Sequence, residues 1–205
     1  MLKIVNLYKN YGDNVILDNY NYEFEFGSYA IIGANGVGKS TLLSILAGIE
    51  KPDSGYIFID GVCLGINSYE AKKKLGYVPD KTYIYPFLTG KCFLQLIMDI
   101  KNADDRNNVL SLQKLFKLDD FLNVQFSEMS LGTQRKFMIT AAFIGNPKII
   151  LMDEPTNGLD FESNSVLVDL VIDYSKNNVV IFSTHDKSFI EETKSNTVKL
   201  QPSKD

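Results

Sequence analysis

The run Gly33-Ala-Asn-Gly-Val-Gly-Lys-Ser40 restricts the possible folds of this 205-residue chain more than any other feature. It follows the apolar segment 29–32 and precedes the helical run 42–46. Its spacing, Gly-x-x-x-x-Gly-Lys-Ser/Thr, lets consecutive backbone N–H groups point inward at the positive end of a helix. A Gly-rich helix cap would explain the glycines alone, but not this context. The sequence therefore predicts a strand–loop–helix unit that binds phosphate groups.

Side chains at the end of this loop suit a phosphate chain. Lys39 supplies a mobile ammonium for β- and γ-phosphates, and Ser40 supplies a hydroxyl for Mg²⁺, a hard cation that takes oxygen ligands. Thr41 offers a second hydroxyl. The expected nucleotide-binding residues of this segment are Gly33, Asn35, Gly36, Gly38, Lys39, Ser40 and Thr41.

Four short apolar runs predict a parallel sheet. Each is rich in β-branched or other apolar residues, as a strand covered on both faces should be, and each is followed by polar residues. Ligands bind at the carboxyl ends of strands in open α/β sheets, so we expect the polar residues to meet at one edge. The runs are 29–32, 76–78, 149–152 and 179–182.

The rest of the chain divides into an antiparallel part and a helical part. Residues 2–29 and 54–61 alternate polar and apolar residues between turn signals, which favours antiparallel strands. Residues 88–145 carry helical patterns, with Phe93, Leu96, Ile97 and Ile100 at helical spacing. We expect a single α/β domain over 1–205, with a core and antiparallel part at about 1–86 and 146–205 and a helical subdomain at about 87–145.

A pair of acidic residues, Asp153 and Glu154, ends the apolar run 149–152. Next to a phosphate loop, Asp153 can hold Mg²⁺ directly or through water. Glu154 points elsewhere and can polarise a water for in-line attack on the γ-phosphate. Taken alone, the pair also fits two solvated loop acids; the phosphate loop favours the catalytic interpretation.

Composition excludes several other classes. The net charge is −4, from 21 Lys and Arg against 25 Asp and Glu, which argues against a dedicated nucleic-acid surface. His185 is the single histidine, so a His-rich metal site is excluded, and Cys63 and Cys92 have no metal spacing and read as reduced thiols of a cytosolic protein. No apolar run approaches the roughly 18–20 residues of a spanning helix, and the N-terminus lacks a secretory signal.

The order of further motifs resembles the ATP-binding cassette family, the nucleotide-binding subunits of ABC transporters. Ser130-Leu-Gly132-Thr-Gln134 is similar to its signature motif and Asn157-Gly-Leu-Asp160 to its D-loop. His185 stands where the family has its switch histidine, and Tyr11 where an aromatic stacks on adenine, although Tyr8 and Tyr20 are nearby. The resemblance spans about residues 2–200 and implies a P-loop NTPase fold.

The resemblance implies an ATPase that uses ATP and Mg²⁺. It makes Glu154, His185 and Lys39 the catalytic residues, with Ser40 and Asp153 at the metal. It also implies a head-to-tail dimer, either a homodimer or a pseudo-symmetric heterodimer. Cofactor contacts then include Tyr11, with Ser130 and Gly132 facing the γ-phosphate of the opposite subunit and Asp160 acting across the interface.

Helix capping is the alternative role for two of these residues. Ser130 would cap a helix that begins near Gln134, and Asp160 would cap the helix that follows it. For Asp160 both roles are compatible.

The implied partner is a membrane-spanning transporter subunit, and the implied location is peripheral, at the cytoplasmic face of the cell membrane, with no nucleic-acid partner. The aromatic segment 83–87, with Tyr83 and Tyr85, is either core or a groove for that subunit. The alternative function is a soluble ABC-type ATPase that is not coupled to transport, such as one serving cofactor assembly. A regulatory cassette without catalysis is disfavoured because Glu154 and His185 are both present.

The chain departs from the family pattern at two motifs. Asp80 stands after Pro79 where a glutamine is usual; it can still ligate Mg²⁺ or orient water. Leu131 replaces the first glycine of the signature, and Thr133 stands where glutamine is common. These forms resemble cassettes of peptide- and antibiotic-export or immunity systems. The transported substrate and its direction are properties of the membrane partner.

Overall fold

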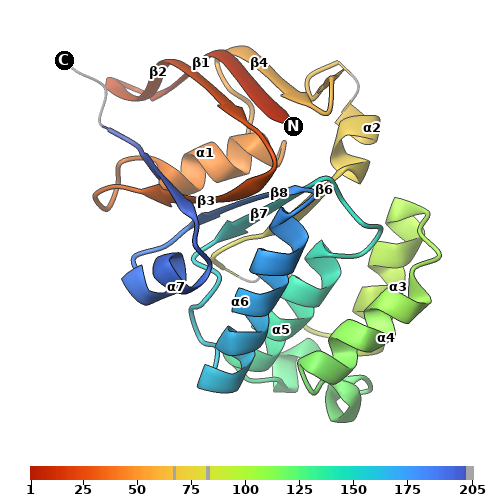
Figure 1. Cartoon of the computed structure of the whole chain (residues 1–205). Helices are drawn as coiled ribbons and strands as arrows, with labels where there is room; N and C mark the ends of the chain where they lie inside the picture. The colour runs from red at the N-terminus through yellow and green to blue at the C-terminus, as the bar shows by residue number, and fades with distance from the viewer. Residues whose placement is uncertain (67, 82–83, 202–205) are drawn as a thin grey trace.

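The computed structural model describes residues 1–66, 68–81 and 84–201. Its elements form layers (Figure 1): an antiparallel sheet lies at the top, helix α1 (Lys39–Leu46) lies beneath it, and a parallel sheet crosses the middle. Further helices cover the other face of the parallel sheet. This is the expected α/β architecture.

The parallel sheet has the strand order β6-β7-β8-β3-β9, and every pair in it is parallel. It contains the four runs predicted from the sequence, each extended by one or two residues. The strand that precedes the end of the described chain, β9, was not predicted. The bounds are β3 (Gly27–Ile32), β6 (Leu75–Val78), β7 (Ile149–Asp153), β8 (Val179–Ser183) and β9 (Asn196–Lys199).

The antiparallel sheet has the order β2-β1-β4-β5, which agrees with the antiparallel strands expected from the sequence. Tyr11 pairs with Asn14, so a two-residue turn joins its first two strands, and Gly12 in that turn has φ +61°. The bounds are β1 (Leu2–Tyr11), β2 (Asn14–Phe24), β4 (Ser54–Ile59) and β5 (Val62–Cys63).

The segment between β6 and β7 is helical in its described part. The proposed limits of the helical subdomain, near residues 87 and 145, remain a prediction. The helices here are α3 (Gly90–Lys101), α4 (Arg106–Leu115) and α5 (Leu131–Ala142), with 3₁₀ turns at Asp119–Phe121 and Phe126–Glu128. Elsewhere the helices are α2 (Ser68–Lys73), α6 (Phe161–Ser175) and α7 (Lys187–Glu192).

The buried face of α3 differs from the predicted one. The helical spacing indicated that Leu96 and Ile100 share a core face with Phe93, but both are exposed. The helix instead buries Phe93 and Leu94. When a helix has apolar residues on more than one face, the elements packed against it, here α5, determine which face is buried.

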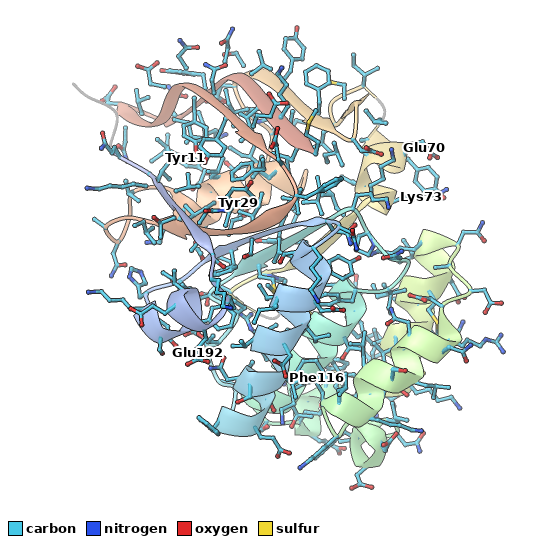
Figure 2. All side chains as sticks on the ribbon, in the orientation of Figure 1. Tyr11, Tyr29, Glu70, Lys73, Phe116 and Glu192 are labelled. Atoms are coloured by element: carbon cyan, nitrogen blue, oxygen red, sulfur yellow. The ribbon has the colours of Figure 1, made fainter. Side chains whose placement is uncertain are left out.

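Two hydrophobic cores lie on opposite faces of the parallel sheet. Alternate residues of β7 enter each core: Ile149 and Leu151 pack on the α1 side, and Ile150 and Met152 pack on the α5 side. Figure 2 shows Tyr29, which packs against the α1-side core, in the upper half and Phe116, from the α5-side core, among the lower helices. Burial on both faces explains why these strands read as continuous apolar runs.

Candidate active site

The loop after β3 turns sharply into α1, as its glycines predicted. Gly38 is the N-cap of α1 at φ +104°, in a region that side chains disfavour. A Cβ atom there would lie 2.3 Å from Cγ2 of Ile16, so β2 approaches too closely for any other residue. Gly36 also has a positive φ, of +77°. The turn places the first N–H groups of α1 at the carboxyl end of β3.

The Lys39 side chain is folded onto this loop. Its ammonium donates to the carbonyl oxygens of Gly33 at 3.0 Å and Ala34 at 3.2 Å, and it lies 3.3 Å from Nε2 of His185. Lys39 is only 8% exposed. The adjacent Ser40 is exposed, and Thr41 is partly exposed. The phosphate-loop cation therefore contacts a residue 146 positions away in the chain.

The two predicted carboxylates leave β7 in different directions. Asp153 is buried and accepts a hydrogen bond from the Ser183 hydroxyl of the neighbouring strand β8. Glu154 has a left-handed backbone at φ +46°, and its N–H donates to the hydroxyl of Ser183 at 3.0 Å. The change of backbone conformation sends the Glu154 side chain away from Asp153.

His185 lies between the loop and Glu154. Its Nε2 atom is 3.5 Å from Oε1 of Glu154, besides its contact with the Lys39 ammonium. The histidine side chain is about half exposed, whereas that of Glu154 is mostly buried. Lys39, Glu154 and His185 thus form one cluster, contributed by three strand ends of the parallel sheet.

Asp80 lies at the exposed end of β6. Its carboxylate accepts a long hydrogen bond, 3.4 Å, from the side-chain amide of Asn157. This contact joins the end of β6 to the segment after Glu154. The expected role of Asp80 towards Mg²⁺ or water remains a prediction.

Tyr11 lies at the end of β1, half exposed. The ammonium of Lys9 is 5.0 Å from the centre of its ring, and its hydroxyl donates to a carboxylate oxygen of Glu50. Partial burial, followed by the bond with Glu50, raises the pKa of Tyr11, and a hydrogen bond with Thr41 acts in the opposite sense. Thr41 is in the first turn of α1, so Tyr11 lies beside the phosphate loop.

The signature segment forms the start of α5. The predicted helix start near Gln134 is wrong: the helix begins at Leu131, because the Ser130 side chain accepts from the N–H of Thr133 at 3.1 Å and caps it. The alternative capping role of Ser130 is therefore present. A Cβ atom on Gly132 would lie 2.4 Å from the carbonyl oxygen of Gly158, so the signature packs directly on the D-loop segment.

Asp160 caps α6 and pairs with α5. Its carboxylate accepts from the N–H of Ser163 at 2.8 Å and lies 2.8 Å from the ammonium of Lys136. The bond from Lys136, followed by that from Ser163, holds the pKa of Asp160 well below its ordinary value. The capping role considered for Asp160 is confirmed, and the ion pair joins α6 to the signature helix.

Besides Tyr11 and Asp80, the predicted residues form two groups. Lys39, Asp153, Glu154 and His185 meet at the sheet edge, with Ser183 linking the two carboxylate positions. Ser130 and Gly132 meet the 158–160 segment instead. Within the part of the chain that the structure describes, no hydrogen bond or ion pair joins Ser130 or Gly132 to Lys39, Glu154 or His185.

The sequence interpretation missed the residue that connects these groups. Arg135 is buried in α5 and donates to backbone carbonyls at the ends of β6 and β7. The only signal in the sequence was its place five residues after Ser130. Its acceptors are 18 to 56 positions away, so they are evident only in the fold.

The donor atoms at this edge fit Mg²⁺. Ser40 offers a hydroxyl and Asp153 a carboxylate, which are oxygen ligands of the kind this cation takes. Among the described residues, no group of three or more His, Cys, Asp or Glu side chains could hold a metal by itself. Mg²⁺ at nucleotide sites is typically bound by one or two protein groups together with phosphates, so the donor set is consistent with a nucleotide-linked ion.

A comparison with protein families matches residues 17–157 to the family described as ABC transporter. The chain belongs to the ABC transporter family. The matched region includes the phosphate loop, the signature and both carboxylates. ABC cassettes bind and hydrolyse ATP, and they dimerise.

Curated relatives in this family cover most of the chain. It is 31% identical to the uncharacterized ABC transporter ATP-binding protein YybJ of Bacillus subtilis (strain 168), over 93% of this chain and 88% of YybJ. It is 29% identical to the linearmycin resistance ATP-binding protein LnrL of the same organism, over 93% of this chain. The chain spans 63% of the length of LnrL.

Solved structures support the same assignment. The dimeric structure of MJ0796, a bacterial ABC transporter cassette, has a TM-score of 0.86 and 28% identity, over 98% of this chain and 94% of that one. A post-hydrolysis structure of MJ0796 with ADP and Pi has a TM-score of 0.85 at 26% identity, with the same coverage. These ABC cassettes share the sheet and helix arrangement of Figure 1.

A membrane-spanning helix requires a long apolar segment. No helix within residues 1–66, 68–81 and 84–201 has the length and hydropathy to cross a bilayer.

Proposed function

We propose that this cassette hydrolyses ATP with Mg²⁺ and, in a dimer, drives a separate membrane-spanning transporter subunit. The observation that carries the proposal is the cluster of Lys39, His185 and Glu154 at the sheet edge, with 3.3 Å and 3.5 Å between successive groups. It joins a phosphate-loop cation to a carboxylate suited to act on water.

Nucleotide binding uses the loop and its surroundings. The backbone N–H groups of the loop and of the first turn of α1 bind the phosphates, and Lys39 contacts the β- and γ-phosphates. Ser40 and Asp153 would hold Mg²⁺, which would neutralise phosphate charge when bound. Tyr11 stacks on the adenine, a contact worth about 1–3 kcal/mol by analogy with base stacking on aromatic side chains.

Hydrolysis uses Glu154 and His185. Glu154 orients the attacking water and accepts its proton. His185 contacts the γ-phosphate and positions both the water and Glu154. The hydroxyl of Ser183 holds the buried carboxylate of Asp153, which would be a ligand for Mg²⁺.

Dimerisation completes each site. Ser130 and Gly132 contact Thr133 and the Gly158 segment rather than the cluster on their own chain, which supports a role towards nucleotide held by a second cassette. Two large apolar side chains beside these segments support an interface: Leu131 is 77% exposed and Phe161 is 89% exposed. Asp160, paired with Lys136, couples the two sites across that interface.

The membrane partner docks on an aromatic pair. Tyr85 and Phe87 are 68% and 64% exposed, and their rings stack with centres 5.5 Å apart. Tyr83, the other residue considered for this groove, lies outside the described residues. A helix of the membrane subunit packs on this pair and holds the cassette at the cytoplasmic face of the membrane.

Export of an antibiotic or peptide is the proposed task of the complete transporter. The similarity to LnrL, a linearmycin resistance ATP-binding protein, supports it. The leucine at position 131 and the aspartate at position 80 are the sequence features that agree with it.

The Glu154→Gln variant tests the catalytic proposal. We expect it to bind ATP, to lose most of its turnover by about 10²-fold or more, and to accumulate as an ATP-bound dimer, because the amide cannot accept the proton. Steady-state ATPase assays and size-exclusion chromatography with ATP measure both effects. Lys39→Ala is the contrasting variant and should weaken nucleotide binding in calorimetry. Turnover of Glu154→Gln at the wild-type rate would refute the assignment.

Co-purification tests the partner. The tagged cassette is expressed with the membrane proteins of its own host and isolated from detergent extract. We expect a multi-spanning membrane subunit to co-purify in a fixed ratio. A cassette recovered only with soluble cofactor-assembly proteins would support the alternative, a soluble ATPase uncoupled from transport.

A further inference from the structure

Arg135 makes an unusually complete set of hydrogen bonds. Its guanidinium has five N–H groups, and these meet five backbone carbonyl oxygens. The acceptors belong to two segments: the end of β6 and the end of β7. They are Pro79, Asp80 at 3.1 Å, Asp153 at 2.6 Å, Glu154, and Pro155 at 3.4 Å.

The positive charge of Arg135 is buried without a direct acidic partner. The residue is 3% exposed, and within the described part of the chain no carboxylate oxygen lies within 4 Å of it in an ion pair. Burial lowers the pKa of Arg135, while Asp80, Asp153 and Glu154 oppose that effect from a greater distance. The charge is therefore held by backbone carbonyl oxygens rather than by a carboxylate.

The backbone held by Arg135 is strained at Glu154. Its φ of +46° is rare for a residue with a side chain, and the following Pro155 further restricts it towards extended conformations. Such a conformation persists only where the surroundings over-determine it. Ser183 binds its N–H, and Arg135 binds its carbonyl oxygen, so the peptide groups on both sides of Cα are fixed.

We propose that Arg135 is a positioning residue that fixes the Glu154 carboxylate for hydrolysis and ties it to the signature helix. Helix α5 begins at Leu131 and carries Arg135 one turn later. Any displacement of the Ser130 end therefore moves the guanidinium that binds the backbone at the ends of β6 and β7. Engagement of the signature is thereby transmitted within the same chain to Glu154. The inference rests on the proposed role of Glu154 in hydrolysis.

Two substitutions and a matched control test this role. Arg135→Gln removes the charge and most of the donors, and Arg135→Lys keeps the charge but not the planar fork that spans both segments. The control is Arg106→Gln, which removes the chain's other arginine, where the side chain is exposed and 3.7 Å from an exposed Asp104. ATP affinity, kcat, KM, ATP-dependent dimerisation and melting temperature are measured for each.

We expect kcat to fall about 10²-fold in Arg135→Gln, the loss typical of a 1 Å misplacement, and less in Arg135→Lys. ATP affinity, KM and dimerisation should stay at the wild-type values, because Arg135 does not contact Lys39, Ser40 or Tyr11 and binds only the backbone of Asp153, whose carboxylate is held by Ser183. Arg106→Gln should leave every quantity unchanged.

Three outcomes overturn the proposal. The first is wild-type kcat in Arg135→Gln or Arg135→Lys while Glu154→Gln remains inactive; this leaves the proposed function intact. The second is a parallel loss of ATP affinity and dimerisation with kcat in both variants. The third is failure of both to fold, which assigns Arg135 to the protein core alone. If Glu154→Gln itself hydrolyses ATP normally, the proposed function fails first.

Discussion

Lys101 illustrates what burial does to a single cation in this protein. Its ammonium donates to the carbonyl oxygen of Ile144 at 2.8 Å. Burial lowers the pKa of Lys101 to about 8, against the partial opposing effect of Asp105. The unfolded chain keeps the ordinary value of 10.5, so between pH 8 and 10.5 it binds more protons than the folded chain. Through this group, folding stability therefore rises with pH across that window.

Replacing Lys101 by Met tests this linkage. Below pH 8 the variant no longer buries a charge, but it leaves the Ile144 carbonyl without that donor. We expect the free energy of unfolding of wild type, relative to the variant, to increase by on the order of 2 kcal/mol from pH 8 to 10.5. Urea unfolding at several pH values measures the difference. A difference that does not change with pH would contradict the burial of this charge.

Where a local motif carries the candidate site residues, their place at the sheet edge could be predicted from the sequence. Gly38, Lys39 and the 153–154 carboxylates follow from contiguous patterns, because a loop, a strand end and a charge lie within a few residues. Ser183 and Arg135 have no such pattern. Their importance comes from a neighbouring strand in one case and from two distant segments in the other, which only the folded sheet brings together.

Helix α6 provides a prediction at the scale of an element. Asp160 caps it through Ser163 and also pairs with Lys136, but the carboxylate is largely exposed, so the ion pair contributes little. We expect Asp160→Ala to lower the free energy of unfolding by about 1 kcal/mol. Asp160→Asn should cost much less, since Asn also caps well.

Urea unfolding at neutral pH separates the two contributions to α6. Equal losses in the Ala and Asn variants would show that the ion pair with Lys136, rather than the cap, stabilises this region. The comparison uses one position and two side chains of similar exposure, so packing changes are small.

The structure agrees with the sequence where a pattern is compatible with one arrangement only. It differs where a pattern is compatible with two buried faces or two boundaries. The parallel strands are apolar throughout because both faces are buried, and no helix of comparable length competes with that pattern. Helix α3 has apolar residues around more than half of its surface, so its own sequence does not determine which of Leu94 and Leu96 is buried. The start of α5 depends on a single cap, Ser130, which moves the boundary by one turn.

The whole molecule presents its functional groups on separate surfaces. The nucleotide cluster lies at the carboxyl edge of the sheet, the signature faces outward from α5, and the aromatic pair of Tyr85 and Phe87 follows β6. A cassette that drives a partner needs these surfaces to respond to one another. Arg135 donates to the carbonyl oxygen of Asp80, just after β6, and Tyr85 follows five residues later in the chain.

Tyr85→Ala tests that docking surface. In vesicles containing the cassette and its membrane subunit, we expect ATP-driven transport of a labelled peptide antibiotic to fall about tenfold, in line with the loss of a central aromatic contact. ATP affinity of the isolated cassette should not change. Tyr69→Ala is the matched control, because Tyr69 is similarly exposed but lies on α2. Normal transport in Tyr85→Ala, or loss of folding, would remove the groove assignment.

The double burial of β7 also limits how this protein can change in length. Its odd and even residues fill different cores, and its last residue is Asp153. One inserted or deleted residue would exchange the two sets of side chains and turn the carboxylate to the opposite face. Natural length variation is therefore expected in connections such as residues 102–105, while the five-residue strand that ends at Asp153 is preserved in length.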